Sequence, residues 1–128
     1  MIIDTSALIA ILWKDPDAAR LIASIDADPS RLMSVGSVLE AALVAQGRGG
    51  DSAERELDVL IQRISIELVS VTAEQCEIAR SGYRRFGKGR HPAGLNYGDC
   101  FSYALAIVAD EPLLFTGGDF SKTDVRVA

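Results

Sequence analysis

The chain has 128 residues, of which 48% are hydrophobic and 24% are charged, and its formal net charge is -5. This length fits a single domain, which we place at residues 1–128, and the apolar content excludes a disordered chain because it offsets the entropy of ordering. No stretch approaches the ~20 apolar residues of a membrane span and no basic leader precedes the first apolar run, so we expect a cytoplasmic protein without a membrane partner.

The first half of the chain alternates between predicted strands and helices. Residues 1–3 and 31–34 are predicted to be short strands, with helices between them at 7–13 and from Asp15 to about residue 28. Asp15 is a good cap, and Pro16 suits the first position of the second helix. Ser37 and Glu40 have the spacing of a capping box for a helix that runs to about residue 47. The glycines at 47–50 predict a break before a further helix.

The second half repeats this alternation. Residues 66–71 are predicted to be a strand, and Thr72 with Gln75 has capping-box spacing for a helix that runs to residue 85. Residues 87–94 form a glycine-rich basic loop, the helix at 96–109 is apolar nearly all round, and strands follow at 113–116 and 125–127. Strands that alternate with helices favour an α/β fold, with a mostly parallel sheet covered on both faces.

Four carboxylates stand at the ends of these apolar runs. Asp4 closes the first strand, and Asp119 follows the strand at 113–116 after a short turn. Glu40 and Asp99 occupy the first turns of predicted helices, where negative charge is favoured. Because ligands of parallel α/β sheets bind at the carboxyl ends of the strands, a fold that gathers these side chains makes an oxygen-rich pocket for a hard divalent cation. Such a pocket can activate water against a phosphodiester.

Each carboxylate also has a structural interpretation. Asp4 could serve only as a helix cap, Glu40 only as the acid of a capping box, and Asp119 only as a turn residue. Asp99 has the weakest alternative, because an unpaired charge in a buried helix would be costly. Asp124 is open between a further acid of the site and a turn residue before the last strand, and we favour the turn.

Other chemistries find little support. The chain has no phosphate-binding glycine motif and no nucleophile elbow, and its one histidine, His91, lies in the basic loop. Cys76 and Cys100 lack metal-type spacing and are predicted to be small buried side chains without a disulfide. The negative net charge argues against a polyanionic partner, but cations bound at clustered carboxylates would reverse the local sign.

The acidic motifs together resemble the PIN-domain ribonucleases, and most of all the VapC toxins of bacterial toxin–antitoxin pairs. The likeness covers essentially the whole chain and is carried by residues 1–8, 37–41, 95–106 and 113–124. It implies a single PIN domain with four to five mostly parallel strands and helices on both faces. It also implies endonucleolytic cleavage of RNA that depends on Mg²⁺ or Mn²⁺ and uses a metal-activated water. The expected partners are RNA, a second copy of the chain, and a small VapB-like antitoxin whose C-terminal segment packs in a groove.

The resemblance also assigns roles to residues. The catalytic and metal-binding roles fall on Asp4, Glu40, Asp99 and Asp119, and Thr5, Ser6 and Thr116 are expected to support them through their hydroxyl groups. Three alternatives stay open at this point: a PIN-domain nuclease that is not a toxin, a module that binds RNA without cutting it, and a metal-dependent phosphatase or 5′-nuclease. The sequence carries no sign of which RNA is the target.

Two surface predictions complete the analysis. The cations before the Asp99 helix either contact the RNA backbone or form a solvated helix end and loop. Trp13, together with Leu12, either faces the antitoxin or packs within the fold. The cations concerned are Arg84, Arg85, Lys88 and Arg90.

Overall fold

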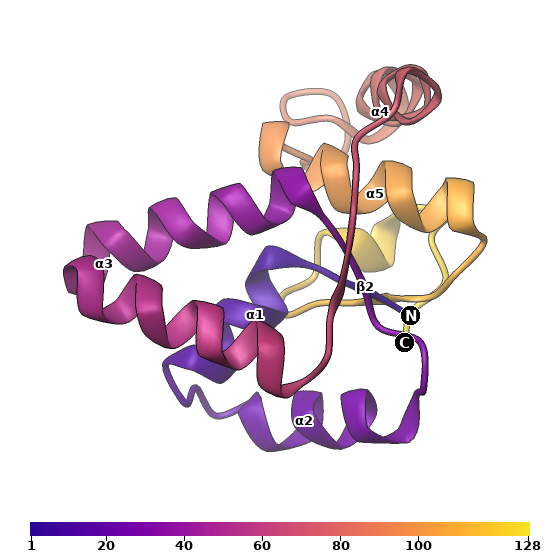
Figure 1. The fold of residues 1–128 in the computed structure, drawn as a ribbon. Helices are drawn as coiled ribbons and strands as arrows, with labels where there is room; N and C mark the ends of the chain where they lie inside the picture. The colour runs from indigo at the N-terminus through magenta and orange to yellow at the C-terminus, as the bar shows by residue number, and fades with distance from the viewer.

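The computed structural model describes residues 1–128 and contains a four-stranded parallel sheet with order β3-β2-β1-β4 (Figure 1). Every pair of neighbouring strands is parallel, which confirms the predicted α/β class. A 3₁₀ turn, η1 (Phe120–Lys122), follows the last strand. The other elements are β1 (Ile2–Ile3), α1 (Thr5–Leu12), α2 (Ala18–Ala27), β2 (Leu32–Ser34), α3 (Val35–Arg63), β3 (Glu67–Val69), α4 (Ala73–Phe86), α5 (Tyr97–Ala109) and β4 (Leu113–Leu114).

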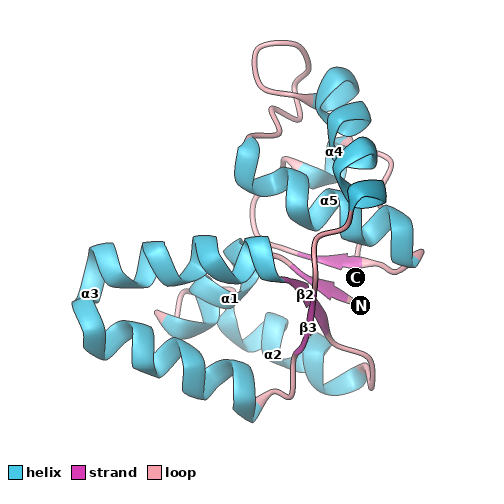
Figure 2. Cartoon of the chain, turned by 45° about the horizontal axis from the view of Figure 1, so that its top comes forward, coloured by secondary structure: helices cyan, strands magenta, loops and turns pink.

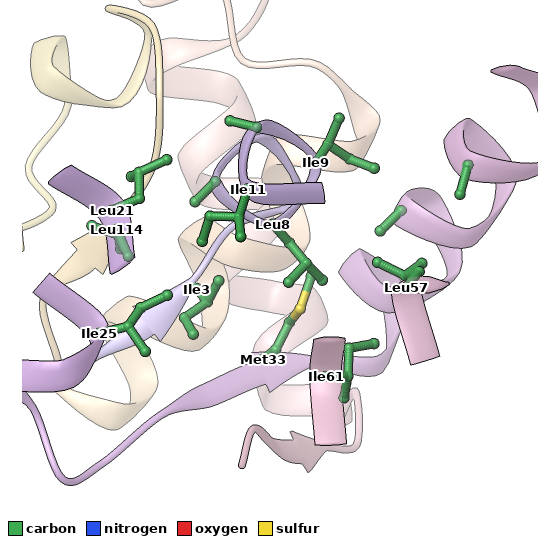
Figure 3. Packing of buried hydrophobic residues seen from close by; sticks show 14 of the residues in the cluster. Ile3, Leu8, Ile9, Ile11, Leu21, Ile25, Met33, Leu57, Ile61 and Leu114 are labelled. Carbon is green, nitrogen blue, oxygen red and sulfur yellow. The ribbon is translucent and has the colours of Figure 1, made fainter. Parts of the chain in front are cut away.

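The two faces of the sheet carry separate hydrophobic clusters. Successive residues of a strand point to opposite faces, so Ile2 and Ile3 of β1 belong to different clusters. Ile3 packs with Met33 and with side chains of α1, α2 and α3 in one cluster, called here the α1-side cluster (Figure 3). On the other face, Ile2 packs with Leu113 and with side chains of α5 in the α5-side cluster. Helices therefore cover both faces, as the sequence predicts.

Both ends of the chain lie beside β4 (Figures 1 and 2). The Ile2 amide donates to the Pro112 carbonyl at 2.7 Å, and the Ala128 amide donates to the Leu113 carbonyl at 3.0 Å. The strand predicted at 125–127 is reduced to one bridge, between Leu113 and Val127. Val125 is buried in the α5-side cluster, so the chain reaches the sheet edge only at its last residues.

The long helix α3 consists of two arms that turn at one glycine. Gly50 has φ 66° and ψ -160°, a conformation that residues with a side chain rarely adopt. The predicted break at 47–50 is thus confirmed but is confined to Gly50. The two arms lie next to each other in Figure 1, and Leu57 and Ile61 of the second arm pack into the α1-side cluster (Figure 3).

The start of α3 differs from the prediction. Its cap is Ser34, the last residue of β2, whose hydroxyl oxygen accepts the Gly36 amide at 3.2 Å. The capping box predicted at Ser37 is therefore wrong, because Ser37 lies inside the helix and is fully buried. Glu40 consequently sits in the second turn of α3 rather than the first. Thr72 caps α4 as predicted, accepting the Gln75 amide at 3.1 Å.

Two further observations concern the cysteines and the helices. Both thiols are free, as expected, and Cys100 is half-buried. Cys76 is exposed on α4, so the prediction that it is a buried side chain is wrong. The reason is that α4 packs chiefly on α5, which leaves its other side in solvent. None of the helices has the length and apolar character needed to cross a membrane.

Candidate active site

The carboxyl ends of β1, β2 and β4 meet at one edge of the sheet, and the predicted site residues gather there. Asp4 follows β1 directly, and α3, which carries Glu40, begins at the end of β2. Thr116 follows β4 after one residue. The N-terminal turn of α5 lies at the same place, because the Glu40 carboxylate packs against Gly98, the residue before Asp99. The negative charges of Asp4, Glu40 and Asp119 act on the Asp99 carboxylate.

Asp4 is the most enclosed of the four carboxylates, with 4% of its surface exposed. Its Oδ2 atom accepts the Ser6 amide at 2.9 Å and the Ser6 hydroxyl at 2.6 Å, and its Oδ1 atom accepts the Ser102 hydroxyl at 2.6 Å. Short hydrogen bonds to a carboxylate are the strong kind. Asp4 also caps α1, so the structural role predicted as an alternative coexists with a place in the acidic cluster.

A chain of hydroxyl groups runs behind Asp4 and was not predicted from the sequence. Ser102 of α5 and Ser37 of α3 lie 3.0 Å apart, oxygen to oxygen, and both are fully buried. Thr5 donates its hydroxyl proton to the Ser37 carbonyl at 3.0 Å. One sequence signal was available, because Ser102 lies three residues after Asp99 and shares its helix face.

Ser6 joins the ends of two neighbouring strands. While its hydroxyl donates to Asp4, the same oxygen accepts the Thr116 amide at 3.1 Å. The contribution of Thr116 in this structure is therefore its backbone N–H group, whereas the prediction concerned its hydroxyl. The result is that the residues after β1 and β4 are held together directly beside Asp4.

Asp99 lies at the third position of α5 and forms a capping box with Asn96. The Asn96 amide donates to Asp99 Oδ2 at 3.0 Å, and the Asp99 amide donates to Asn96 Oδ1 at 2.9 Å. Burial raises the pKa of Asp99 to about 6, and the negative charges of Asp4, Glu40 and Asp119 add to the rise. The Asn96 hydrogen bond opposes it. A carboxyl group with this pKa is mostly ionised at neutral pH, and a bound cation would favour that charged form further.

Glu40 lies against the backbone of α5. A Cβ atom at Gly98 would be 1.4 Å from Glu40 Oε2, so only glycine leaves room for this carboxylate. Burial raises the pKa of Glu40, and the Asp4 charge raises it further, while the nearby Thr5 hydroxyl opposes the shift. The Thr5 hydroxyl can donate only one hydrogen bond, and in this structure it donates to the Ser37 carbonyl.

Asp119 stands apart from the other three acids. It is exposed, precedes η1, and its side chain makes no capping hydrogen bond. Its link to the cluster is electrostatic, through Asp99. No three acidic, histidine or cysteine side chains are arranged closely enough to hold one ion between them. The donor set nevertheless fits a hard divalent cation in chemistry, because it is all oxygen and the negative charges of its neighbours raise the pKa of Glu40 and of Asp99.

Asp124 takes no part in this cluster. It accepts an Arg85 N–H at 2.9 Å and the Tyr103 hydroxyl at 2.9 Å. Burial raises the pKa of Tyr103 to about 12, and Asp124 adds to the rise. Asp124 thus holds α4, α5 and the last residues together, in line with the structural interpretation. Arg85 is paired here and lies 4.6 Å from the centre of the Phe86 ring.

The other cations of the basic stretch are exposed. Arg84 and Lys88 border a groove of about 690 Å³ between α4 and the start of α5, and Arg90 lies in the loop after α4. His91 accepts the Ala93 amide at 3.0 Å and packs edge-on against Phe86. These contacts give His91 a part in the structure of the loop.

Leu12 and Trp13 have different surroundings. Leu12 lines a second groove, of about 390 Å³, between α1 and the second arm of α3. Trp13 is half-buried, packs on the α1-side cluster, and has the Arg48 guanidinium 5.3 Å from its ring centre. Both side chains therefore pack on the same cluster, and of the two only Leu12 also lines an open groove.

Comparisons with known proteins agree on one family. The family model of the PIN domain matches residues 1–126. The chain is 55% identical to the ribonuclease VapC30 of Mycobacterium tuberculosis, over 98% of this chain and 95% of that protein. The crystal structure of M. tuberculosis VapC20, a sarcin-ricin loop cleaving toxin, has a TM-score of 0.80 at 21% identity and covers 99% of this chain and 97% of that one. The VapBC2 complex of Rickettsia felis, bound to a DNA fragment from its promoter, has a TM-score of 0.75 at 13% identity, covering 99% and 96%.

The two structural matches support the fold, and the high identity over nearly the full length supports a more specific assignment. The chain therefore belongs to the PIN-domain family and, within it, to the VapC ribonucleases.

Proposed function

We propose that this protein is the toxin of a toxin–antitoxin pair and cleaves RNA internally in a reaction that depends on Mg²⁺ or Mn²⁺. The observation that carries the proposal is that Asp4, Glu40 and the start of α5 with Asp99 lie at one sheet edge, where burial and the neighbouring negative charges raise the pKa of Asp99 to about 6. The names of the full-length relatives support ribonuclease chemistry and the toxin role. We further propose that residues 1–128 act as one domain in the cytoplasm, the compartment that contains the RNA substrate.

Asp4, Glu40 and Asp99 are the residues that would hold the divalent cation, and Asp119 would contribute to a second one. Hard cations prefer oxygen ligands, and a buried group of carboxylates repels itself unless cations are present. When bound, such a cation supplies positive charge that polarises a phosphodiester and acidifies water.

The protein side chains have supporting tasks in this reaction. Ser6 and Ser102 hold the Asp4 carboxylate through three hydrogen bonds, which fixes its direction. Thr5 and the Ser37 carbonyl hold the start of α3, which carries Glu40. Attack of water on phosphorus, in line with the departing 3′-oxygen, leaves 5′-phosphate and 3′-hydroxyl ends. No lysine or histidine stands among the acids to act as a general base.

Two surfaces suit the proposed protein partners. The groove beside Leu12 combines the apolar side chains of Ile11 and Val59 with the cations Arg55 and Arg63, so it suits an amphipathic antitoxin segment. A stripe on α3 at i, i+4 spacing suits a second copy of the chain, because large apolar side chains remain exposed there. The stripe consists of Val35, Leu39 and Leu43, which are 41%, 60% and 65% exposed.

The decisive experiment is incubation of the purified protein with total RNA, in Mg²⁺ and in EDTA, followed by mapping of the new 5′ ends. We expect internal cuts with 5′-phosphate ends that need the metal and disappear in Asp4→Asn. Retention of RNA without cuts in either condition would support an RNA-binding module instead. Release of terminal phosphate alone would support a phosphatase, and either result would overturn the proposal.

A further inference from the structure

The groove between α4 and the start of α5 combines cations and aromatic rings next to the acidic cluster. Its volume is about 690 Å³. Arg80, Arg84 and Lys88 bring positive charge from α4 and the following loop. Tyr83 of α4 and Tyr97 of α5 add two aromatic side chains. None of the four carboxylates lines it, so the groove is distinct from the acidic cluster.

The groove and the cluster share the first turn of α5. Asn96 lines the groove, and its side-chain oxygen accepts the amide of Asp99 at 2.9 Å. Tyr97 and Cys100 also line the groove and flank Asp99 on both sides in the sequence. A ligand in this groove therefore lies within one helical turn of a predicted metal ligand. This adjacency favours a portion of the RNA substrate over a protein segment.

Two of the three cations have no acidic partner. Arg80 pairs with Glu77 at 2.9 Å, whereas Arg84 and Lys88 form no salt bridge. They stand four residues apart, at the end of α4 and just after it. In a chain with a net charge of -5, unpaired cations that border one groove are suited to an anionic ligand.

Among the large hydrophobic side chains of the molecule, Tyr97 is the most exposed, at 81%. Its ring packs on one neighbour, Phe101, with the two ring planes nearly perpendicular and the centres 5.1 Å apart. A ring presented in this way offers a flat face to an unpaired base. Bases of single-stranded RNA stack on such rings, whereas the bases of a duplex are already stacked on one another.

We propose that this groove binds one unpaired nucleotide beside the cleaved bond, with its base on Tyr97 and its phosphate near Arg84 and Lys88. The inference rests on the proposed ribonuclease function and adds a specificity element to it. The groove would favour RNA loops and single strands over duplex RNA, without requiring a particular base.

The test measures RNA binding in EDTA, where cleavage is absent. The probe is a fluorescein-labelled RNA of twelve nucleotides that cannot pair with itself, used alone and annealed to its complement. We expect Tyr97→Ala to weaken binding of the single strand about tenfold and Tyr97→Phe to preserve it. Binding of the duplex should be the same in all three proteins. Unchanged thermal unfolding of Tyr97→Ala would show that the fold is intact.

A second measurement addresses the cations through the salt dependence of binding. Arg84→Gln and Lys88→Gln should each lower the slope of log K against log salt by about 0.7. Arg20→Gln on α2 removes one charge far from the groove and is the matched control, with no change of slope expected.

The outcomes separate this inference from the proposed function. If the wild type cuts RNA with Mg²⁺ while Tyr97→Ala and Arg84→Gln bind the single strand as tightly as the wild type does, the inference alone is wrong. The same holds if Tyr97→Ala disturbs only self-association or capture of a protein partner. If the wild type neither binds nor cuts RNA, the proposed function is wrong and the inference falls with it.

Discussion

The Ser102 hydroxyl donates a 2.6 Å hydrogen bond to Asp4 Oδ1, across 98 residues of sequence. Both groups are buried, so water does not compete for the bond. Ser102 in turn lies 3.0 Å from Ser37, which connects α5, the end of β1 and the start of α3. One side chain of α5 thereby orients the carboxylate that follows β1.

Replacing Ser102 with alanine should affect both stability and activity. The Asp4 Oδ1 atom loses its only hydrogen-bond donor in a buried place, which costs about 1–2 kcal/mol of unfolding free energy. Looser positioning of Asp4 should lower RNA cleavage about tenfold, the effect typical of groups that orient a metal ligand. Chemical denaturation and cleavage rates measure the two effects. Ser24→Ala, a half-buried serine on α2, is the control, and equal losses in both variants would contradict the assignment.

Asp4→Asn should separate charge from shape. The amide oxygen can still accept from Ser6, and the Ser102 hydroxyl can rotate to accept the amide N–H, so the fold should survive. Loss of the negative charge should reduce cleavage at least about a hundredfold, because the cation loses a ligand. Asp26→Asn, an exposed carboxylate on α2, should cleave at the wild-type rate. Full activity of Asp4→Asn, measured on the same RNA, would remove Asp4 from the site.

Gly98→Ala tests the contact between α5 and Glu40. The added methyl group would lie 1.4 Å from Glu40 Oε2, so the carboxylate must move away. The moving atoms are the end of a flexible side chain, and alanine favours a helix by about 1 kcal/mol over glycine, so stability should change little. Cleavage should nevertheless fall about tenfold or more.

A double variant shows whether Gly98 acts through Glu40. In a Glu40→Ala background, the Gly98→Ala change should cause no further loss of cleavage, because the displaced carboxylate is already absent. Additive losses in the double variant would mean that Gly98 serves the site in another way.

Because the pKa of Asp99 is raised, its ionisation should destabilise the folded, metal-free protein at neutral pH. Its pKa is about 6 in the folded state and 3.8 in the reference state, so the folded protein binds the proton more tightly. The resulting stabilisation is complete below pH 3.8 and is lost as the pH rises through about 6. Asp99→Asn should therefore match the wild type near pH 4 and exceed it above pH 6.5, by about 1–2 kcal/mol after allowance for solvent screening. Urea unfolding in EDTA at a series of pH values measures the difference, and a constant difference would contradict the prediction.

With divalent metal present, the wild type should become more stable than Asp99→Asn at neutral pH. Mg²⁺ added to the wild type at a hundred times its dissociation constant raises the unfolding free energy by about 2.7 kcal/mol, since it binds only the folded state. Asp99→Asn should gain much less, because it lacks one ligand. Thermal unfolding with and without Mg²⁺ at pH 7.5 is the measurement. An equal gain in both proteins would place the metal elsewhere.

Local patterns accounted for much of the fold. The Thr72 cap is decided by residues three apart, so the sequence predicts it, whereas the capping box of Asn96 and Asp99 was not predicted. The start of α3 was mispredicted because Ser34 and Ser37 are both suitable caps, and only the burial of Ser37 against Ser102 distinguishes them. A contact between distant helices leaves no periodic trace in the sequence.

By itself, the sequence determined the alternation of strands and helices and the position of the acids at the ends of apolar runs, since both depend on neighbours along the chain. Only the tertiary structure decided what each acid touches. Asp124 accepts hydrogen bonds from Arg85 and Tyr103, and Asp4 accepts them from Ser6 and Ser102. Glu40 packs against Gly98. The reason is that these contacts arise from helices packed on a shared sheet edge, where residues far apart in sequence become neighbours.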